Sequence, residues 1–266
     1  PKTPKPHEHI LLQVFFYTYM EKQVEIYGIR SIIEAIESSK EISKVYLLKY
    51  DSPQSSLFRS LIILLERKNI KSSFVPKEKF KKYSDKNHQG AVAILSPVSL
   101  LSIEDLISST FDEKSPKTYL LLDGVTDTRN FGAIIRTSVA ADIDGIIISQ
   151  NNSAPINADV VKTSSGGVFK IPIARVSNIK DAILYLSSIN VDIVSLSEKA
   201  DKTIYEVDFK KSVGLILGSE DRGISKSILS LSNETVSIPI SSKIDSLNVS
   251  VAFSAVIFEL VRQRRF

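Results

Sequence analysis

The sequence predicts an α/β protein with a mostly parallel sheet in its second half and a smaller α/β unit before it. From residue 119 onward, short runs of β-branched residues and leucine alternate with segments whose apolar residues recur at helical spacing. Strands that alternate with helices are typical of a parallel sheet covered on both faces. A length of 266 residues, with 43% hydrophobic and 24% charged side chains, fits one or two globular domains.

In the first half, the expected helices are 30–38 and 54–68, and the expected strands are 45–48, 72–75 and 91–95. The second helix rests on apolar residues at helical spacing, at Leu57, Leu61, Leu64 and Leu65. Segment 99–117 is poorer in strand signals and contains Ser115-Pro116. We therefore expect a short connecting helix and a linker there, and place the domain boundary within it.

In the second half, the expected strands are 119–122, 145–148, 171–174, 192–196, 213–217 and 236–238. The helices expected between and after them are 130–141, 158–164, 179–188, 226–231 and 249–262. Ligands of such sheets bind outside the carboxyl ends of the strands. The loops after Leu122, Leu217 and Pro239 are therefore where functional residues are expected.

Composition excludes several classes of site. The chain has no cysteine and only three histidines, which excludes disulfide scaffolds, thiol nucleophiles and iron–sulfur clusters, and we expect no metal site. The lack of cysteine fits a reducing interior, so we expect a cytoplasmic protein without a membrane partner. With 34 Lys and Arg against 30 Asp and Glu, the net charge of +4 slightly favours an anionic partner.

Residues 1–19 are considered apart from the fold. They begin with a Pro/Lys stretch and continue into the apolar run 10–19, which is too short to span a bilayer and has no signal-peptide cleavage site after it. We expect a leader or a cloning remnant here, with Met20 as the start of the protein. An added surface strand or helix is the alternative.

Three polar clusters each follow a predicted strand and open a predicted helix. They are 123–137 with Asn130, Gly132 and Arg136, 218–225 with Glu220 and Ser225, and 238–250 with Ser246 and Asn248. No P-loop and no dinucleotide-binding glycine motif accompanies them. Taken singly, they are explained by helix caps at Asn130, Ser225 and Asn248 and by turn glycines. Three clusters in this order and on these elements indicate a functional site.

The same clusters carry a resemblance to a known family. The matching residues are Asn130-x-Gly-x-x-x-Arg136-Thr, Gly218-x-Glu220-x-x-Gly223-x-Ser225, and Ile238-Pro followed by Ser246-Leu-Asn248-Val-Ser-Val-Ala252. They resemble the SpoU (TrmH-like) branch of the SPOUT RNA methyltransferases, and the resemblance covers essentially everything after Met20. The first half is similar to the substrate-binding domain of the ribosomal RNA subgroup, through Tyr27-Gly28-Ile29 and His88-Gln89-Gly90. Thr128 and Ser242 depart from the family pattern, which often has proline and glycine there.

The resemblance implies a domain organisation that periodicity does not give. It implies a ribosomal-protein L30-like (L30e-like) substrate-binding domain over 20–98, a linker over 99–117, and a SpoU methyltransferase domain over 118–266 with a deep trefoil knot. It also implies S-adenosylmethionine bound in the knot and a homodimer formed through the knotted domain. The apolar stretch 249–260 fits a helix buried in the knot or in the dimer interface.

The activity implied is methylation of a ribose 2′-hydroxyl in RNA, with a guanosine of large-subunit (23S) ribosomal RNA as the expected target. By motif match, Arg136 acts at the reacting hydroxyl, and four residues complete the site: Asn130, Glu220, Ser246 and Asn248. The expected cofactor contacts are Gly218, Ser219, Ile238 and Leu247. Arginine stays protonated near neutral pH, so stabilisation of the developing alkoxide is favoured over the general-base role often given to Arg136 in this family.

RNA contact is expected from a basic run in the first half. Its candidate RNA-binding residues are Lys81, Lys82, Lys86 and His88, interleaved with Phe80 and Tyr83. Lysines attract phosphates without regard to base sequence, and aromatic rings stack on unpaired bases. A solvated loop is the alternative.

Two other functions stay open. Transfer-RNA ribose methyltransferases and antibiotic-resistance ribosomal RNA methyltransferases belong to the same family, although the transfer-RNA enzymes usually lack the L30-like half. A non-catalytic RNA-binding ribosome-assembly protein would share the fold without needing the five catalytic candidates together. We therefore expect a methyltransferase that acts on ribosomal RNA.

Overall fold

The structure is a computed structural model that describes residues 25–37, 40–49, 55–96, 98–112 and 115–265. The leader expected at 1–19 lies outside these residues. The chain folds into two compact units. The N-terminal unit consists of the described residues up to Ser99 with the short segment Pro155–Ala158, and the C-terminal unit consists of Leu100–Ala154 and the described residues from Asp159 onward.

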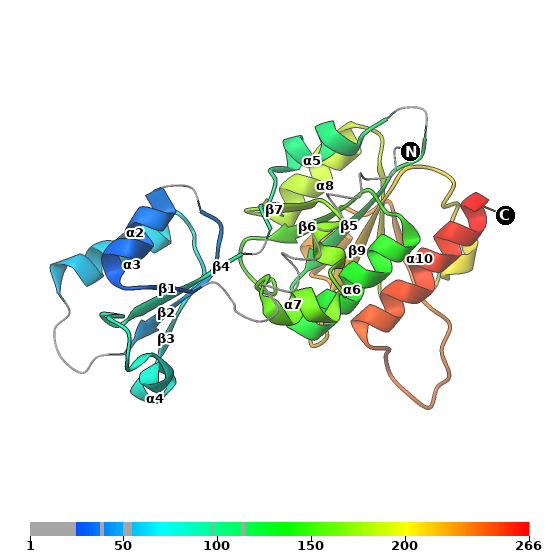
Figure 1. Cartoon of the computed structure of the whole chain (residues 1–266). Coiled ribbons are helices and arrows are strands. Elements are labelled where there is room, and N and C mark those ends of the chain that lie inside the picture. Colours follow the sequence, from blue (N-terminus) through cyan, green and yellow to red (C-terminus); the bar gives the residue numbers. More distant parts are fainter. Residues whose placement is uncertain (1–24, 38–39, 50–54, 97, 113–114, 266) are drawn as a thin grey trace. The chain divides into compact units, whose positions relative to one another are not determined.

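The N-terminal unit has a sheet with the strand order β1-β4-β2-β3 (Figure 1). Strand β4 is antiparallel to β1 and β2, and β2 is parallel to β3. The elements are β1 (Glu25–Tyr27), α2 (Ile29–Glu37), β2 (Ile42–Leu48), α3 (Ser56–Arg67), β3 (Ser72–Val75), α4 (Lys77–Phe80), the 3-10 turn η1 (Lys81–Tyr83) and β4 (Ala91–Leu95). The expected helices and strands of this half are confirmed. The short elements β1, α4 and η1 escape prediction because three or four residues carry no readable periodicity.

Alternation along β2 gives this sheet two different faces. Val45 and Leu47 are fully buried in the core that the sheet forms with α2 and α3. Leu48 points to the opposite face, where it packs with Phe80 and Tyr83 from α4 and η1. The core of the unit therefore lies mainly on the side of the two long helices.

The C-terminal unit has a sheet with the strand order β10-β8-β9-β5-β6-β7, in which all neighbouring strands are parallel. Its elements are α5 (Ile103–Thr110), β5 (Thr118–Asp123), α6 (Thr128–Ala141), β6 (Gly145–Ser149), α7 (Ala158–Thr163), η2 (Gly167–Phe169), β7 (Ile173–Val176), α8 (Ile179–Ser188), β8 (Asp192–Leu196), η3 (Ile204–Glu206), β9 (Val213–Gly218), α9 (Lys226–Leu229), β10 (Glu234–Val236) and α10 (Val249–Arg265). The predicted parallel α/β architecture is confirmed.

Helices cover both faces of this sheet (Figure 1). Helices α5 and α8 share a buried core with Tyr119, Leu121 and Ile147 on one face. Helices α6 and α10 pack against each other on the other face, where Thr137 Oγ1 and Ser254 Oγ lie 3.3 Å apart. The trefoil knot that the resemblance implies stays a prediction.

The segment 99–117, expected to be a linker with a short helix, contains α5. Ser102 caps this helix by accepting a hydrogen bond from the Asp105 backbone N–H at 3.0 Å. Leu106 is fully buried in the core of the C-terminal unit. Part of this segment therefore contributes to the C-terminal core.

The end of α10 is tied to the sheet by one arginine. The Arg264 guanidinium donates to the carbonyl oxygens of Phe209 at 2.8 Å and Lys211 at 2.6 Å, and to the Thr118 hydroxyl at 2.7 Å. Thr118 begins β5, and residues 209–211 lead into β9. The planar guanidinium can serve acceptors in several directions at once, which a lysine ammonium at this position cannot.

We expect Arg264→Lys to lower the free energy of unfolding by about 2 kcal/mol, because hydrogen bonds to a charged donor are lost and carbonyl acceptors are left unpaired. Urea denaturation followed by circular dichroism measures this. Arg265→Lys is the matched control, because Arg265 is exposed. Equal stability of the two variants would contradict the clamp.

Candidate active site

Three loops that leave the carboxyl ends of strands hold the polar clusters. They are the β5–α6 loop, the β9–α9 loop and the β10–α10 loop. Strands β5 and β9 are neighbours with Asp123 opposite Gly218, so two of the loops leave the sheet side by side. The Ser225 backbone N–H also donates to Asp123 Oδ2 at 3.2 Å. The topology therefore joins clusters that lie far apart in the sequence.

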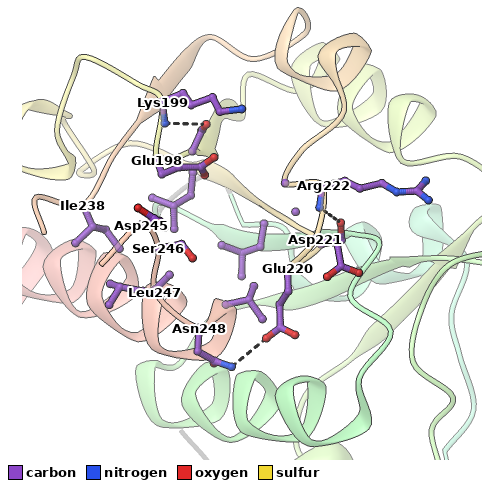
Figure 2. A pocket seen from close by; sticks show the side chains of 18 of the residues that line it. Glu198, Lys199, Glu220, Asp221, Arg222, Ile238, Asp245, Ser246, Leu247 and Asn248 are labelled. Atoms are coloured by element: carbon purple, nitrogen blue, oxygen red, sulfur yellow. Dashed lines mark hydrogen bonds between the residues drawn. The ribbon is translucent and has the colours of Figure 1, made fainter. Parts of the chain in front are cut away.

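A cavity of about 660 Å³ lies at these loops (Figure 2). All four expected cofactor contacts and three of the expected catalytic residues line it: Gly218, Ser219, Ile238, Leu247, Glu220, Ser246 and Asn248. Its volume falls within the range of small-molecule sites, roughly 300–1,000 Å³. We call it the larger cavity.

Close backbone packing shapes the wall of this cavity at Gly218. A Cβ atom on Gly218 would lie 2.1 Å from the carbonyl carbon of Gly223, a distance that no packed side chain tolerates. The turn between them is closed by two hydrogen bonds, from Ser219 N–H to the Gly223 oxygen at 3.2 Å and from Gly223 N–H to the Ser219 oxygen at 2.9 Å. Gly223 itself has a φ of +64°, which favours glycine. Both glycines of the motif are therefore required by geometry.

Side chains from the first turn of α6 and from the β10–α10 loop meet Glu220 of the β9–α9 loop. Asn130 Nδ2 donates to Glu220 Oε1 at 2.5 Å, and Asn248 Nδ2 donates to the same oxygen at 3.0 Å. Asn248 Nδ2 also donates to Asn130 Oδ1 at 3.0 Å. These three residues are the site triad. Three of the five predicted catalytic residues therefore lie within hydrogen-bond distance of one another.

Asn130 is free for this role because another residue caps its helix. Asp127 is the N-cap of α6, and its Oδ1 accepts from the backbone N–H groups of Arg129 at 2.9 Å and Asn130 at 2.8 Å. The reading of Asn130 as an N-cap is therefore wrong. Asn248 does both jobs, since its Oδ1 accepts from Ser250 N–H at 2.9 Å while its amide nitrogen reaches Glu220.

A second cavity of about 390 Å³ adjoins the first and shares residues 219–223 and Val249 with it. The residues that line only this smaller cavity come mainly from the β5–α6 loop and include Asp123, Asp127 and Asn130. Glu220 lines both cavities, Asn130 lines the smaller one and Asn248 the larger one. The site triad therefore stands between two compartments.

Arg136 lies apart from this triad. It is exposed on α6, and among the described lining residues of the two cavities it does not occur. The reason is helical geometry, because six residues beyond Asn130 correspond to about 240° around the axis and about 9 Å along it. One copy of the chain brings Ser246 to the larger cavity but leaves Arg136 outside both.

The lysines expected to contact RNA lie in the N-terminal unit and differ in their partners. Lys81 is exposed, Lys82 pairs with Glu25 at 3.2 Å, and Lys86 pairs with the preceding aspartate at 3.0 Å. Partial burial raises the pKa of Glu25, but hydrogen bonds from Tyr83, from a second tyrosine and from Lys82 outweigh it, so the pKa falls below its ordinary value. Two of the three lysines are therefore engaged with carboxylates.

His88 is held within the same unit. Its ring lies against Phe80, with centroids 4.8 Å apart, and its Nδ1 accepts from the Gly90 backbone N–H at 2.9 Å. The acceptor role fixes a proton on Nε2 whenever the imidazole is neutral. Its contact with RNA stays a prediction.

Sequence reasoning missed one wall of the larger cavity. Leu196 at the end of β8 and residues 197–199 directly after it line this cavity together with the motif residues (Figure 2). No motif marks them, and Glu198 and Lys199 read as ordinary loop residues. The available signal is topological, because β8 is the parallel neighbour of β9 and its carboxyl end must open at the same edge.

Comparison with known proteins gives consistent matches over both units. Residues 117–258 match the SpoU rRNA Methylase family, and residues 26–101 match the RNA 2′-O ribose methyltransferase substrate-binding domain. An uncharacterized tRNA/rRNA methyltransferase of Mycoplasma genitalium is 37% identical, over 88% of this chain and 95% of its own length. The 23S rRNA (guanosine-2′-O-)-methyltransferase of Shewanella oneidensis is 34% identical, over 92% of this chain and 100% of its own length.

A solved structure shares the fold. The AdoMet-bound rRNA methyltransferase from Sinorhizobium meliloti superposes with a TM-score of 0.58 at 23% identity, covering 97% of this chain and 95% of that one. Across the described ranges, no helix is long and apolar enough to cross a membrane, and no group of three or more His, Cys, Asp or Glu side chains is placed to hold a metal ion. Because the family match spans more than half of the sequence and the curated relatives cover nearly all of it, the chain belongs to the SpoU rRNA methylase family.

Proposed function

We propose that this chain transfers a methyl group from S-adenosylmethionine to a ribose 2′-hydroxyl of RNA, with a guanosine of 23S ribosomal RNA as its target. The observation that carries the proposal is the site triad, which holds a carboxylate between two cavities of small-molecule size. The relative that supports the target is named a 23S rRNA (guanosine-2′-O-)-methyltransferase and matches over its entire length.

The larger cavity fits S-adenosylmethionine, which when bound supplies an electrophilic methyl group on a sulfonium. Apolar side chains of Leu217, Ile238 and Leu247 offer contacts for a base. Its lining contains more carboxylates than cations. The charged residues in it are Glu198, Glu220, Asp221, Asp245, Lys199 and Arg222. This balance suits a ligand that carries a sulfonium and an ammonium group.

The site triad positions the acceptor. Within the part of the chain that the structure describes, both amide donors of the triad reach Glu220 Oε1, which leaves Oε2 for a further donor. A hydroxyl that enters from the smaller cavity finds this oxygen at the shared wall. Fixed by two amides, Glu220 holds the acceptor in place, and such positioning supplies much of the rate enhancement of a displacement reaction. Ser246, in the wall of the larger cavity, is assigned to the substrate phosphate.

Arg136 is assigned to the alkoxide that develops at the reacting oxygen. A guanidinium group stabilises negative charge and does not take up the hydroxyl proton. That proton is lost to water as the bond between the methyl carbon and the ribose oxygen forms and the bond between the methyl carbon and sulfur breaks, with S-adenosylhomocysteine as the leaving group. The exposed position of Arg136 on α6 leaves it available to a large substrate or to a second copy.

We further propose a cytoplasmic homodimer. Val251 and Phe258, which are 53% and 48% exposed, lie seven residues apart on α10 and therefore on one face of that helix. Exposed apolar side chains that share one face of a helix favour an interface there.

The first experiment is calorimetric titration with S-adenosylmethionine followed by methyl transfer to unmodified 23S ribosomal RNA, with mass mapping of the product. We expect cofactor binding and one ribose-methylated guanosine, because the larger cavity has the size of a small-molecule site and the site triad lies at its wall. Methylation of transfer RNA alone would show that transfer RNA, and not 23S ribosomal RNA, is the substrate. A protein that binds RNA but no cofactor would be a non-catalytic scaffold.

Two variants separate cofactor binding from methyl transfer. Gly218→Ala should weaken cofactor binding by about tenfold or more, because its Cβ displaces the 219–223 turn. Arg136→Lys should bind cofactor normally and lose about a hundredfold in turnover, because lysine keeps the charge and loses the fork geometry. Calorimetry and single-turnover methylation measure the two effects. Near-normal turnover of Arg136→Lys would count against a need for the guanidinium.

The homodimer predicts the effect of a charge on α10. Phe258→Lys should convert a particle of twice 29.5 kDa into a monomer, because an ammonium group would be buried in the interface. Light scattering coupled to gel filtration measures the mass. Leu184→Lys on α8 is the matched control, since this leucine is 57% exposed outside α10. A monomeric unmodified protein would overturn the assignment.

A further inference from the structure

One face of the N-terminal sheet is only partly covered. Alternation along β2 places Lys44, Tyr46 and Leu48 on the face opposite α2 and α3. Leu48 is buried beneath α4 and η1, whereas Lys44 and Tyr46 are partly exposed. The face therefore has a closed end at Leu48 and an open end at Tyr46 and Lys44.

Positive charge gathers around Tyr46 at the open end. The ammonium groups of Lys44 and Lys79 lie over its ring, 5.0 Å and 6.0 Å from the centroid. Val45 lies opposite Ser72 in the parallel pair β2–β3, so the preceding residues, Lys44 and Lys71, lie opposite each other. Lys71 is therefore on the same face as Lys44. Lys44 of β2 and Lys79 of α4 thus meet at one aromatic ring, and Lys71, just before β3, lies near Lys44.

These cations stand close enough to repel one another. Burial, followed by the neighbouring charges of Lys71 and Lys79, lowers the pKa of Lys44 below its ordinary value. Glu25, on the same sheet, is already hydrogen-bonded to Lys82 and Tyr83. An incoming polyanion would relieve this repulsion, and the partly exposed ring of Tyr46 offers a π-face that a phosphate alone would not use.

We propose that this face is a binding surface for single-stranded RNA, with one base stacked on Tyr46 and the flanking phosphates held by Lys44, Lys71 and Lys79. The inference rests on the proposed RNA substrate and adds where the N-terminal unit holds it. Stacking on an aromatic side chain requires an unpaired base, which a duplex does not offer. The surface is formed by other lysines than the predicted run at Lys81, Lys82 and Lys86.

The test uses the full chain and a fluorescein-labelled oligouridylate of about 12 nucleotides, with binding followed by anisotropy. Tyr46→Leu should weaken binding by about tenfold, because it removes the π-face, whereas Tyr46→Phe should bind within about twofold of the unmodified protein. Combined Lys44→Gln, Lys71→Gln and Lys79→Gln should reduce the slope of log affinity against log salt by about 2, at about 0.7 for each phosphate contact.

A matched control removes three cations from the helical side of the same unit: Lys40→Gln, Arg67→Gln and Lys68→Gln. The salt slope of this control should stay closer to that of the unmodified protein. Equal slopes for the two triple variants would overturn the proposal, as would unchanged affinity in Tyr46→Leu at an unchanged melting temperature. Equally tight binding of oligoglutamate would also overturn it, in favour of a surface for acidic peptides.

Cofactor calorimetry and methyl transfer to 23S ribosomal RNA separate this inference from the proposed function. A protein that methylates RNA while its Tyr46 and lysine variants bind oligouridylate normally would retain the function and refute the surface. A protein that shows the oligouridylate effects without methylating any RNA would retain the surface and refute the function.

Discussion

The site depends on the Glu220 carboxylate, because its hydrogen bonds connect the first turn of α6, the β9–α9 loop and the β10–α10 loop, which lie far apart in the sequence. Its partners Asn130 and Asn248 lie 90 and 28 residues away along the chain. Only a parallel sheet, with its carboxyl strand ends at one edge, brings such segments together without a long excursion of the chain. Glu220 lines both cavities, and its partners Asn130 and Asn248 each line one of them.

Close backbone packing is the second constraint, and it explains residues that carry no functional group. A Cβ on Gly132 would lie 1.7 Å from Thr163 Oγ1, so α6 approaches α7 only with glycine there. Gly218 allows the same kind of approach to Gly223. The first two family motifs therefore combine a polar side chain that meets the site with a glycine that lets the backbone pack closely.

The sequence predicts the architecture well and the site in part, for different physical reasons. Buried strands such as β5 and β9 are read from their composition, because burial on both faces demands continuous apolar runs. The direction of a side chain depends on which residue caps the helix, and here Asp127 caps α6 and releases Asn130. The positions of Glu198 inside the larger cavity and of Arg136 outside it depend on tertiary geometry, which no local sequence pattern predicts.

Charge divides the work between the two units. The smaller cavity is lined by Asp123, Asp127, Glu220 and Asp221 against Arg222, so the C-terminal site repels a polyanion on approach. Such a site can accept a single nucleoside through hydrogen bonds but gains nothing from long-range attraction to RNA. Cations of the N-terminal unit can supply this attraction, since Lys44 and Lys79 lie over the ring of Tyr46 and Lys71 lies near Lys44. An enzyme built this way can bind RNA through one unit while its reaction centre keeps the carboxylates that a cationic cofactor favours.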